Sequence, residues 1–298
     1  MGMSEFYGSF DENESIKTLH KAIDLGVDFF DTADMYGWGA NERLLAKAFK
    51  GRWSELVLAT KFAVMRGPNG EFLGVNGNPD YIKTACETSL RNLGIEAIDL
   101  YYMHRKDPKV EIEDIVGAMA ELVEQGKVKH LGLSEVDAET LRRAHAIHPI
   151  TALQSEYSLW SREPEEEIFD VCRELGIAFV SYSPLGRGFL TGAIKNRDGF
   201  EEGDFRLRNS RFSDEAIKEN MKFVEVINGI AREKGATNAQ IALAWILSQN
   251  DDITAIPGTR KVHRLEENLG AFHVELSRED LNLIDEGVPS ETVGERYG

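Results

Sequence analysis

Four side chains of the sequence are of the types that together can transfer a proton to an oxygen atom. Asp31 and Tyr36 lie in the segment DTADMYG, Lys61 lies in LATKF, and His104 lies in DLYYMHR. A tyrosine hydroxyl has an ordinary pKa of about 10, so it donates a proton near neutral pH only where a nearby cation stabilises its phenolate. Lys61 supplies that cation, Asp31 holds the ammonium in a partly buried site, and His104 orients a substrate oxygen. Such a group protonates a carbonyl oxygen while hydride reaches its carbon.

Each of these four residues also has a purely structural interpretation. Asp31 can cap a helix, and Tyr36 can pack on an adjacent loop. Lys61 can be a solvated strand end, and His104 can be a core histidine whose hydrogen bonds are satisfied. Taken singly, each residue favours its structural role. The functional interpretation therefore depends on whether the fold brings all four side chains to one place.

Strands and helices alternate along the chain. Apolar residues at helical spacing predict helices over residues 13–25, 79–93, 112–124, 138–146, 164–175, 214–234, 237–248 and 262–269. Short, largely apolar runs predict strands over residues 27–30, 56–61, 98–103, 128–134, 151–157, 177–183 and 253–257. This alternation is typical of a parallel sheet covered by helices.

The predicted fold is α/β, a (β/α)8 TIM barrel formed as a single domain over residues 1–298, because no Pro-, Gly- or Ser-rich linker divides the chain. Seven strands are predicted, and the first strand of the barrel is apparently missing from the N-terminus. Either the assigned start codon lies downstream of the true one, or the barrel has an open edge; the first is favoured because an unpaired edge invites aggregation. Active sites of such barrels lie at the C-terminal ends of the strands, where the four residues are predicted to converge.

Composition and charge exclude several classes of function. The chain has 298 residues, with 34 Lys and Arg against 51 Asp and Glu, and its formal net charge of −17 argues against nucleic acid or an anionic membrane as a partner. Cys86 and Cys172 lie far apart with no Cys/His cluster nearby, so no disulfide framework and no metal site is predicted. The sequence contains no apolar run of roughly 20 residues and no signal peptide. We therefore expect a soluble, cytoplasmic protein. The sequence does not predict its oligomeric state.

Motifs of other enzyme classes are absent from the sequence. The segment GRGFLTG is one residue too long for the dinucleotide fingerprint GxGxxG, so no Rossmann domain is indicated. No GxxxxGK[ST], GxSxG or HExxH motif occurs. The sequence therefore does not predict phosphoryl transfer, serine hydrolysis or zinc proteolysis.

Seven motifs in order resemble the successive strand-end motifs of the aldo-keto reductases: FDTADMYG, LATKF, DLYYMHR, GLSE, LQSEYSL, SYSPLGRG and IPGTRKVHRLEEN. The resemblance extends from Phe30 to the C-terminus. It is strongest for the branch with the IPGTR motif and a GERY ending, here residues 294–297, which includes auxin-induced-protein-like and pyridoxal-reductase-like members.

The resemblance implies roles for individual residues. Tyr36 would be the proton donor, Asp31 and Lys61 would tune it, and His104 would bind and polarise the carbonyl. The implied cofactor-binding residues are Ser134 and Gln154 at the nicotinamide carboxamide, Tyr182 stacked on the nicotinamide ring, and Ser183, Leu185, Gly186 and Gly188 around the pyrophosphate. Glu135 stands where many relatives carry Asn, so the role of that position is open.

A cationic segment in this acidic chain predicts NADPH as the cofactor. Gly258, Thr259, Arg260 and Lys261 lie at the last strand, and Arg264 lies in the following helix. Guanidinium groups form bidentate bonds to phosphate, so Arg260 and Arg264 are the expected contacts of a 2′-phosphate. Glu267 and Asn268 match the adenine-contacting positions of the family. The alternative is an ordinary solvated helix start with surface arginines.

The substrate prediction is less specific. Tyr7, Trp38, Phe62 and Trp160 can wall an apolar pocket, although each can equally cover the core. The expected partner is a small-molecule carbonyl compound that is reduced to an alcohol with NADPH. One alternative is an NADPH-binding regulatory or accessory subunit without significant turnover, and another is an inactive fragment. The complete set of four proton-transfer residues weighs against an accessory role.

Overall fold

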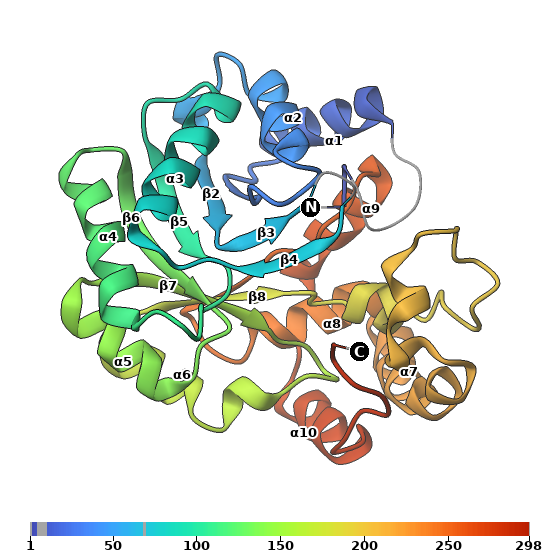
Figure 1. Cartoon of the computed structure of the whole chain (residues 1–298). Helices are drawn as coiled ribbons and strands as arrows, with labels where there is room; N and C mark the ends of the chain where they lie inside the picture. The colour runs from blue at the N-terminus through green and yellow to red at the C-terminus, as the bar shows by residue number, and fades with distance from the viewer. Residues whose placement is uncertain (1, 5–10, 68–69, 298) are drawn as a thin grey trace.

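The computed structural model describes residues 2–4, 11–67 and 70–297. At its centre lies a curled sheet of seven parallel strands in the order β1-β2-β5-β6-β7-β8-β9, with helices around its outer side (Figure 1). Its strands are β1 (Phe29–Asp31), β2 (Val57–Phe62), β5 (Ile98–Met103), β6 (Val128–Ser134), β7 (Ile150–Glu156), β8 (Ala178–Tyr182) and β9 (Ile253–Ala255). The predicted α/β barrel architecture and its seven strands are confirmed.

The helices follow the predicted alternation. They are α1 (Glu12–Asp24), α2 (Ala40–Ala48), α3 (Pro79–Leu93), α4 (Ile112–Glu124), α5 (Ala138–Ile147), α6 (Ile168–Leu175), α7 (Asp214–Lys234), α8 (Asn238–Leu247), α9 (Val262–Leu269) and α10 (Arg278–Gly287). The predicted helix over residues 164–175 begins only at Ile168, after a short 3-10 turn at Glu163–Glu165. Helices α2 and α10 were not predicted. Nor was the antiparallel hairpin of β3 (Val64–Arg66) and β4 (Phe72–Val75), which is separate from the main sheet.

Local sequence signals fix most helix ends. Asp11 accepts a hydrogen bond from the backbone N–H of Glu14 at 2.9 Å and so caps α1, and the Ser213 side chain caps α7 in the same way. Gly94 ends α3 with a φ of 67° and Gly235 ends α7 with a φ of 63°, a left-handed conformation that glycine adopts without steric cost. The loops that follow therefore start at defined positions.

The strands send alternate side chains to two cores. The inner core of the curl is formed by Ala59, Leu100, Tyr102, Ala152 and Val180. The outer core, between sheet and helices, includes Phe62, Tyr101, Met103, Leu133 and Leu153. Gly132 pairs with Tyr102 in the register, and a Cβ atom at Gly132 would lie 2.4 Å from the tyrosine ring. The glycine therefore makes room for Tyr102 inside the curl.

Strands β1 and β9 stand at the two ends of the strand order, and no pairing between them occurs in the described ranges. Helices α1 and α9 approach each other at this edge. The Thr18 hydroxyl donates to the Arg260 carbonyl at 3.1 Å, and Lys261 forms an ion pair with Glu14 at 2.7 Å. Contacts outside the sheet thus join the first and last parts of the barrel.

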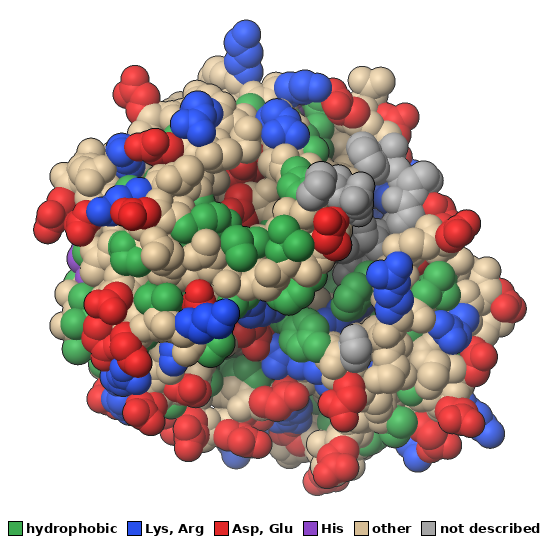
Figure 2. All heavy atoms as spheres, in the orientation of Figure 1, with side chains coloured by type: hydrophobic (Ala, Val, Ile, Leu, Met, Phe, Trp, Pro, Cys, Tyr) green, Lys and Arg blue, Asp and Glu red, His purple; other side chains and the backbone are tan. Residues whose placement is uncertain are grey.

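The C-terminal segment returns from α10 toward the end of β8 (Figure 1). Figure 2 shows a hollow on the same face of the molecule, with Lys and Arg side chains gathered within and beside it. Among the helices that the structure describes, none has the length and apolar character needed to cross a membrane.

Candidate active site

Most of the predicted site residues lie at the C-terminal ends of neighbouring strands. Asp31 ends β1, Ser134 ends β6, Tyr182 ends β8, and His104 follows β5 directly. The alternation that sends Ala59 and Tyr102 to the inner core sends residues two positions along the same strand to the same side. Lys61 and His104 therefore face the inside of the curl at its C-terminal end, where active sites of β/α barrels lie.

A buried ion pair forms the base of the site. Lys61 is fully buried, and its ammonium pairs with Asp31 and donates a hydrogen bond to the Thr32 carbonyl at 2.8 Å. The other carboxylate oxygen of Asp31 accepts a hydrogen bond from the Gln154 amide at 2.9 Å. Burial lowers the pKa of Lys61 from its ordinary value, and the charge of Asp31 opposes this effect. The ammonium is consequently held in one place by charge and by hydrogen bonds.

The side chains of Tyr36 and His104 lie beside this ion pair. The Lys61 ammonium is 5.6 Å from the centroid of the Tyr36 ring. The Tyr36 and His104 rings meet edge to face, with centroids 5.9 Å apart and an interplanar angle of 86°. The structure thus brings together all four residues of the predicted proton-transfer group.

The imidazole of His104 is held in its neutral form. Burial, followed by the charges of Lys61 and Arg105, keeps its pKa well below the ordinary value. Its Nδ1 atom is buried and has no hydrogen-bond partner among the described residues. A neutral ring in this position can donate one N–H to a substrate oxygen without carrying a competing positive charge.

The loop after β8 has the backbone conformation of an anion cradle. Ser183, Gly186, Arg187 and Gly188 all have positive φ angles, of 51°, 56°, 55° and 93°. Left-handed residues in a tight turn direct successive N–H groups toward one side, where an anion binds. A Cβ atom at Gly186 would lie 2.6 Å from the ring of Trp160, so only glycine fits there. Leu185 lies within the same turn.

The segment from Gly258 to Asn268 leads from β9 into α9. Thr259 accepts a hydrogen bond from the Lys261 backbone N–H at 3.1 Å, and the Glu267 carbonyl accepts one from Gln240 at 3.1 Å. Asn268 is buried, whereas Arg264 is exposed and makes no ion pair in the part of the chain that the structure describes. The predicted phosphate-binding segment thus presents the exposed guanidinium of Arg264 in the first turn of α9, where a helix favours anions, and the partly exposed Arg260 precedes that helix.

The predicted substrate pocket needs correction at two positions. Phe62 is fully buried and packs on Tyr101 in the outer core, with ring centroids 5.1 Å apart, because it directly follows the inward-facing Lys61. Trp160 stacks on Phe189 at 4.9 Å and is also a core side chain. Trp38 is exposed and its indole N–H donates to the Arg66 carbonyl at 3.3 Å. Tyr7 lies outside the described residues.

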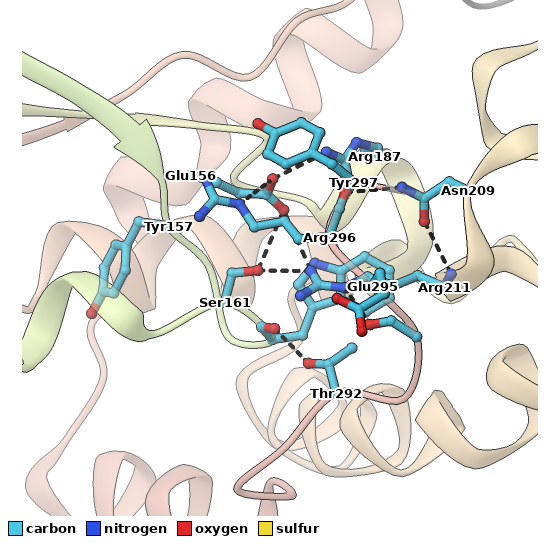
Figure 3. Close-up of polar contacts among 12 residues, drawn as sticks. Glu156, Tyr157, Ser161, Arg187, Asn209, Arg211, Thr292, Glu295, Arg296 and Tyr297 are labelled. Atoms are coloured by element: carbon cyan, nitrogen blue, oxygen red, sulfur yellow. Dashed lines mark hydrogen bonds and ion pairs between the residues drawn. The ribbon is translucent and has the colours of Figure 1, made fainter. Parts of the chain in front are cut away.

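A buried charge cluster beside the site was not predicted. Glu156, the last residue of β7, is fully buried and is surrounded by the guanidinium groups of Arg187, Arg211 and Arg296, at 3.0, 3.5 and 3.1 Å (Figure 3). These arginines come from the anion cradle, the segment before α7, and the C-terminus. Glu156 therefore joins three separate segments to one strand end, and one of them, the C-terminal segment, carries the GERY motif.

Glu135 belongs to the same cluster. Its carboxylate pairs with Arg296 and accepts a hydrogen bond from the Glu156 backbone N–H at 2.9 Å. Tyr297, which follows Arg296 in the sequence, contacts the hydroxyl of Tyr182 and accepts a hydrogen bond from Arg105 at 3.1 Å. The position that the sequence left open thus anchors the C-terminal segment against the site.

Replacing Glu156 by glutamine is expected to lower the free energy of unfolding by about 3 kcal/mol or more, because three guanidinium groups then lose a shared, buried carboxylate. A chain of this size should show a fall in Tm of roughly 5–10 °C. The matched control is Glu166→Gln, which changes an exposed residue nearby. Equal Tm values for the two variants in calorimetry would show that the cluster does not stabilise the fold.

Comparison with known proteins identifies relatives over nearly the whole chain. The family model described as "Aldo/keto reductase family" matches residues 1–288. The chain is 46% identical over 303 residues to "Aldo-keto reductase yakc [NADP(+)]" of Schizosaccharomyces pombe, covering 100% of this chain and 89% of the relative. It is 47% identical to "Probable aldo-keto reductase 1" of Glycine max, covering 100% of this chain and 86% of that protein.

Solved structures of similar fold include enzymes with bound ligands. The glycerol dehydrogenase AKR11B4 from Gluconobacter oxydans superposes with a TM-score of 0.85 at 26% identity, over 95% of this chain and 87% of that one. An aldo/keto reductase from Klebsiella pneumoniae, in complex with NADP and acetate, has a TM-score of 0.74 at 25% identity, over 96% of this chain and 90% of that one.

Proposed function

The chain belongs to the aldo/keto reductase family, and from this premise we propose that it reduces aldehydes or ketones to alcohols with NADPH, using Tyr36 as the proton donor. The protein is thus an oxidoreductase enzyme. The observation that carries the proposal is the buried Asp31–Lys61 ion pair beside the Tyr36 ring, with His104 perpendicular to that ring. Nothing in ordinary core packing requires a fully buried lysine, a buried carboxylate, a buried histidine and a partly exposed tyrosine at one end of a sheet.

Each of the four side chains has a separate role in the protonation of the carbonyl oxygen. NADPH, when bound, supplies the hydride. The neutral His104 ring donates an N–H to the carbonyl oxygen and holds it in the direction of Tyr36. Tyr36 then gives its hydroxyl proton to that oxygen, and the Lys61 ammonium stabilises the negative charge left on the tyrosine. Asp31 keeps the ammonium charged and fixed, in spite of its burial.

The residues present fit the dinucleotide. In the anion cradle, the Nη1 atom of Arg187 is buried and has no hydrogen-bond partner among the described residues. The pyrophosphate suits this donor and the backbone N–H groups of the same loop, apart from those of Gly186 and Gly188, which donate to the Ser183 and Leu185 carbonyls at 2.8 and 3.0 Å. Ser134 and Gln154 would hold the carboxamide, and Tyr182 would face the nicotinamide ring. The names of the Schizosaccharomyces pombe and Klebsiella pneumoniae relatives, which mention NADP, support the same cofactor.

The assay that tests the proposal follows the absorbance of the reduced nicotinamide when the protein is mixed with an activated aromatic aldehyde. We expect oxidation of NADPH at a rate well above that of NADH. If the absorbance does not change with either cofactor, in a protein that still binds NADPH, the accessory-subunit alternative would replace the proposal.

Replacing Arg264 by alanine is expected to weaken NADPH binding by about tenfold or more, because a guanidinium bond to phosphate is charge-assisted. The Kd for NADH, which lacks the 2′-phosphate, should not change. Fluorescence titration measures both constants. Arg278→Ala, an exposed arginine at the start of α10, is the matched control. Equal weakening of NADPH and NADH binding would remove Arg264 from the phosphate site.

A further inference from the structure

Arg105 is a cation beside the proposed active site whose hydrogen-bond acceptors are all uncharged. Its Nη1 atom donates to the His104 carbonyl at 2.6 Å and to the Ser134 hydroxyl at 3.1 Å. Its Nη2 atom donates to the Tyr297 hydroxyl at 3.1 Å. Within residues 2–4, 11–67 and 70–297, Asp and Glu side chains make ion pairs with many arginines but with none of the Arg105 nitrogens.

Arg105 differs from the neighbouring arginines in its charged partners. Arg187, Arg211 and Arg296 all contact the carboxylate of Glu156, so each of them has a negatively charged partner inside the protein. Arg105 is partly buried and makes no ion pair with a described Asp or Glu side chain, and the Glu135 carboxylate, whose charge does act on it, is paired with Arg296. Removing a guanidinium from water without a counter-charge costs free energy, which a bound anion would offset.

The position of Arg105 decides which molecule can bring the anion. It directly follows His104, whose ring faces Tyr36, and its hydrogen bond to Ser134 places it at the end of β6. A substrate whose carbonyl oxygen lies between Tyr36 and His104 therefore has this guanidinium beside it, at the border of the site that Ser134 and Tyr182 would form for the nicotinamide. Figure 2 shows Lys and Arg side chains within the hollow on this face.

We propose that Arg105, together with the hydroxyl of Tyr297, binds a carboxylate on the carbonyl substrate, so that aldehydes or ketones bearing an acid group are the preferred substrate class. The proposal rests on the reductase function proposed above. One guanidinium and one neutral hydroxyl match a singly charged carboxylate, whereas a doubly charged phosphate favours more than one cation.

The C-terminal segment completes this binding site. Arg296 fixes the segment to Glu156 and Glu135, and Asn209 donates to the Arg296 carbonyl at 3.0 Å. Gly294 has a φ of 94°, and a Cβ atom there would lie 2.6 Å from the Arg211 backbone nitrogen. These contacts hold the Tyr297 hydroxyl next to Arg105 before any substrate arrives, which lowers the entropic cost of binding.

The test compares two substrates of nearly equal shape, 4-carboxybenzaldehyde and its neutral amide, 4-formylbenzamide. The readout is the ratio of kcat/KM for the acid to kcat/KM for the amide. We expect a ratio above one in the wild type and a fall of about 10- to 100-fold in Arg105→Gln, because the variant loses a charge-assisted bond to the acid alone. Arg105→Lys, which keeps the charge but not the planar fork, should give an intermediate ratio. Arg142→Gln, on the outer face of α5, is the control.

Each outcome decides between the proposals. A ratio that does not change in Arg105→Gln, or a wild-type enzyme that favours the amide, would overturn the carboxylate site while leaving the reductase function intact. Absence of turnover with both aldehydes in the wild type would overturn the proposed function itself. Raising the salt concentration should increase the KM of the acid but not that of the amide, since screening weakens only the charged contact.

Discussion

The variant Tyr36→Phe is expected to reduce aldehydes about 10²- to 10⁴-fold more slowly than the wild type, with NADPH bound at the same Kd. The substitution removes one hydroxyl and leaves the ring, so the edge-to-face contact with His104 at 5.9 Å is retained. Without the hydroxyl, the developing alkoxide has no proton donor beside the Lys61 ammonium. The loss should therefore fall on kcat and leave the fold and the cofactor site unchanged.

Two measurements separate this loss from a structural effect. The Tm of Tyr36→Phe should match that of the wild type, and fluorescence titration should give the same NADPH affinity. Phe62→Leu, which changes a core aromatic residue one position after Lys61, is the control for altered packing near the site. Retention of more than half of the wild-type kcat by Tyr36→Phe would remove this tyrosine from the role of proton donor.

Lys61→Met is expected to lower kcat by about 10²- to 10³-fold, because the negative charge that forms on Tyr36 then has no cation beside it. The substitution also leaves Asp31 as a buried carboxylate that keeps only the Gln154 amide and loses its ion-pair partner. Such an uncompensated charge costs about 3–5 kcal/mol of stability, so the single variant should also melt earlier.

The double variant Lys61→Met with Asp31→Asn distinguishes catalysis from stability. It has no buried charge at either position, so its Tm should recover toward that of the wild type. Its activity should stay as low as that of the single variant. Recovery of activity together with Tm would mean that Lys61 serves only to neutralise Asp31.

The pH dependence of kcat gives an independent test of Lys61. A lysine carries its charge below its pKa and loses it as the pH rises, and burial lowers the pKa of Lys61 from 10.5. The rate of the wild type should accordingly fall on the alkaline side, at a pH below 10.5. Lys61→Met should show no such fall, because its residual rate does not depend on a proton at this position.

The sequence predicted, for a physical reason, that the four polar side chains lie close together. In a β/α repeat, the end of each strand is marked by the change from apolar to polar residues, and all parallel strands present these ends on one side. Asp31, Lys61 and His104 could thus be assigned to one place before any contact was known. The same alternation explains the error at Phe62, because residues next to each other in a strand point to opposite faces.

Other features had weaker local signals. Helix α2 follows Gly39, which has no side chain to cap the helix, so the sequence has no capping residue that would indicate its start. Helix α10 does have one, the capping box of Ser277 and Asp280, which the pattern of apolar residues alone did not reveal. The charge cluster joins Glu156 to Arg187 and Arg296 across 31 and 140 positions of sequence. No local pattern encodes contacts of that range, so the cluster became visible only with the fold.

Isotope transfer tests whether hydride passes to the carbonyl carbon while Tyr36 protonates the carbonyl oxygen. NADPH deuterated at the transferable C4 position is incubated with the protein and 4-formylbenzamide, and the alcohol is examined by mass spectrometry. We expect an alcohol with one deuterium on the former carbonyl carbon, formed by the wild type and not detectably by Tyr36→Phe in the same time. An alcohol without deuterium, or equal labelling by both proteins, would contradict this mechanism.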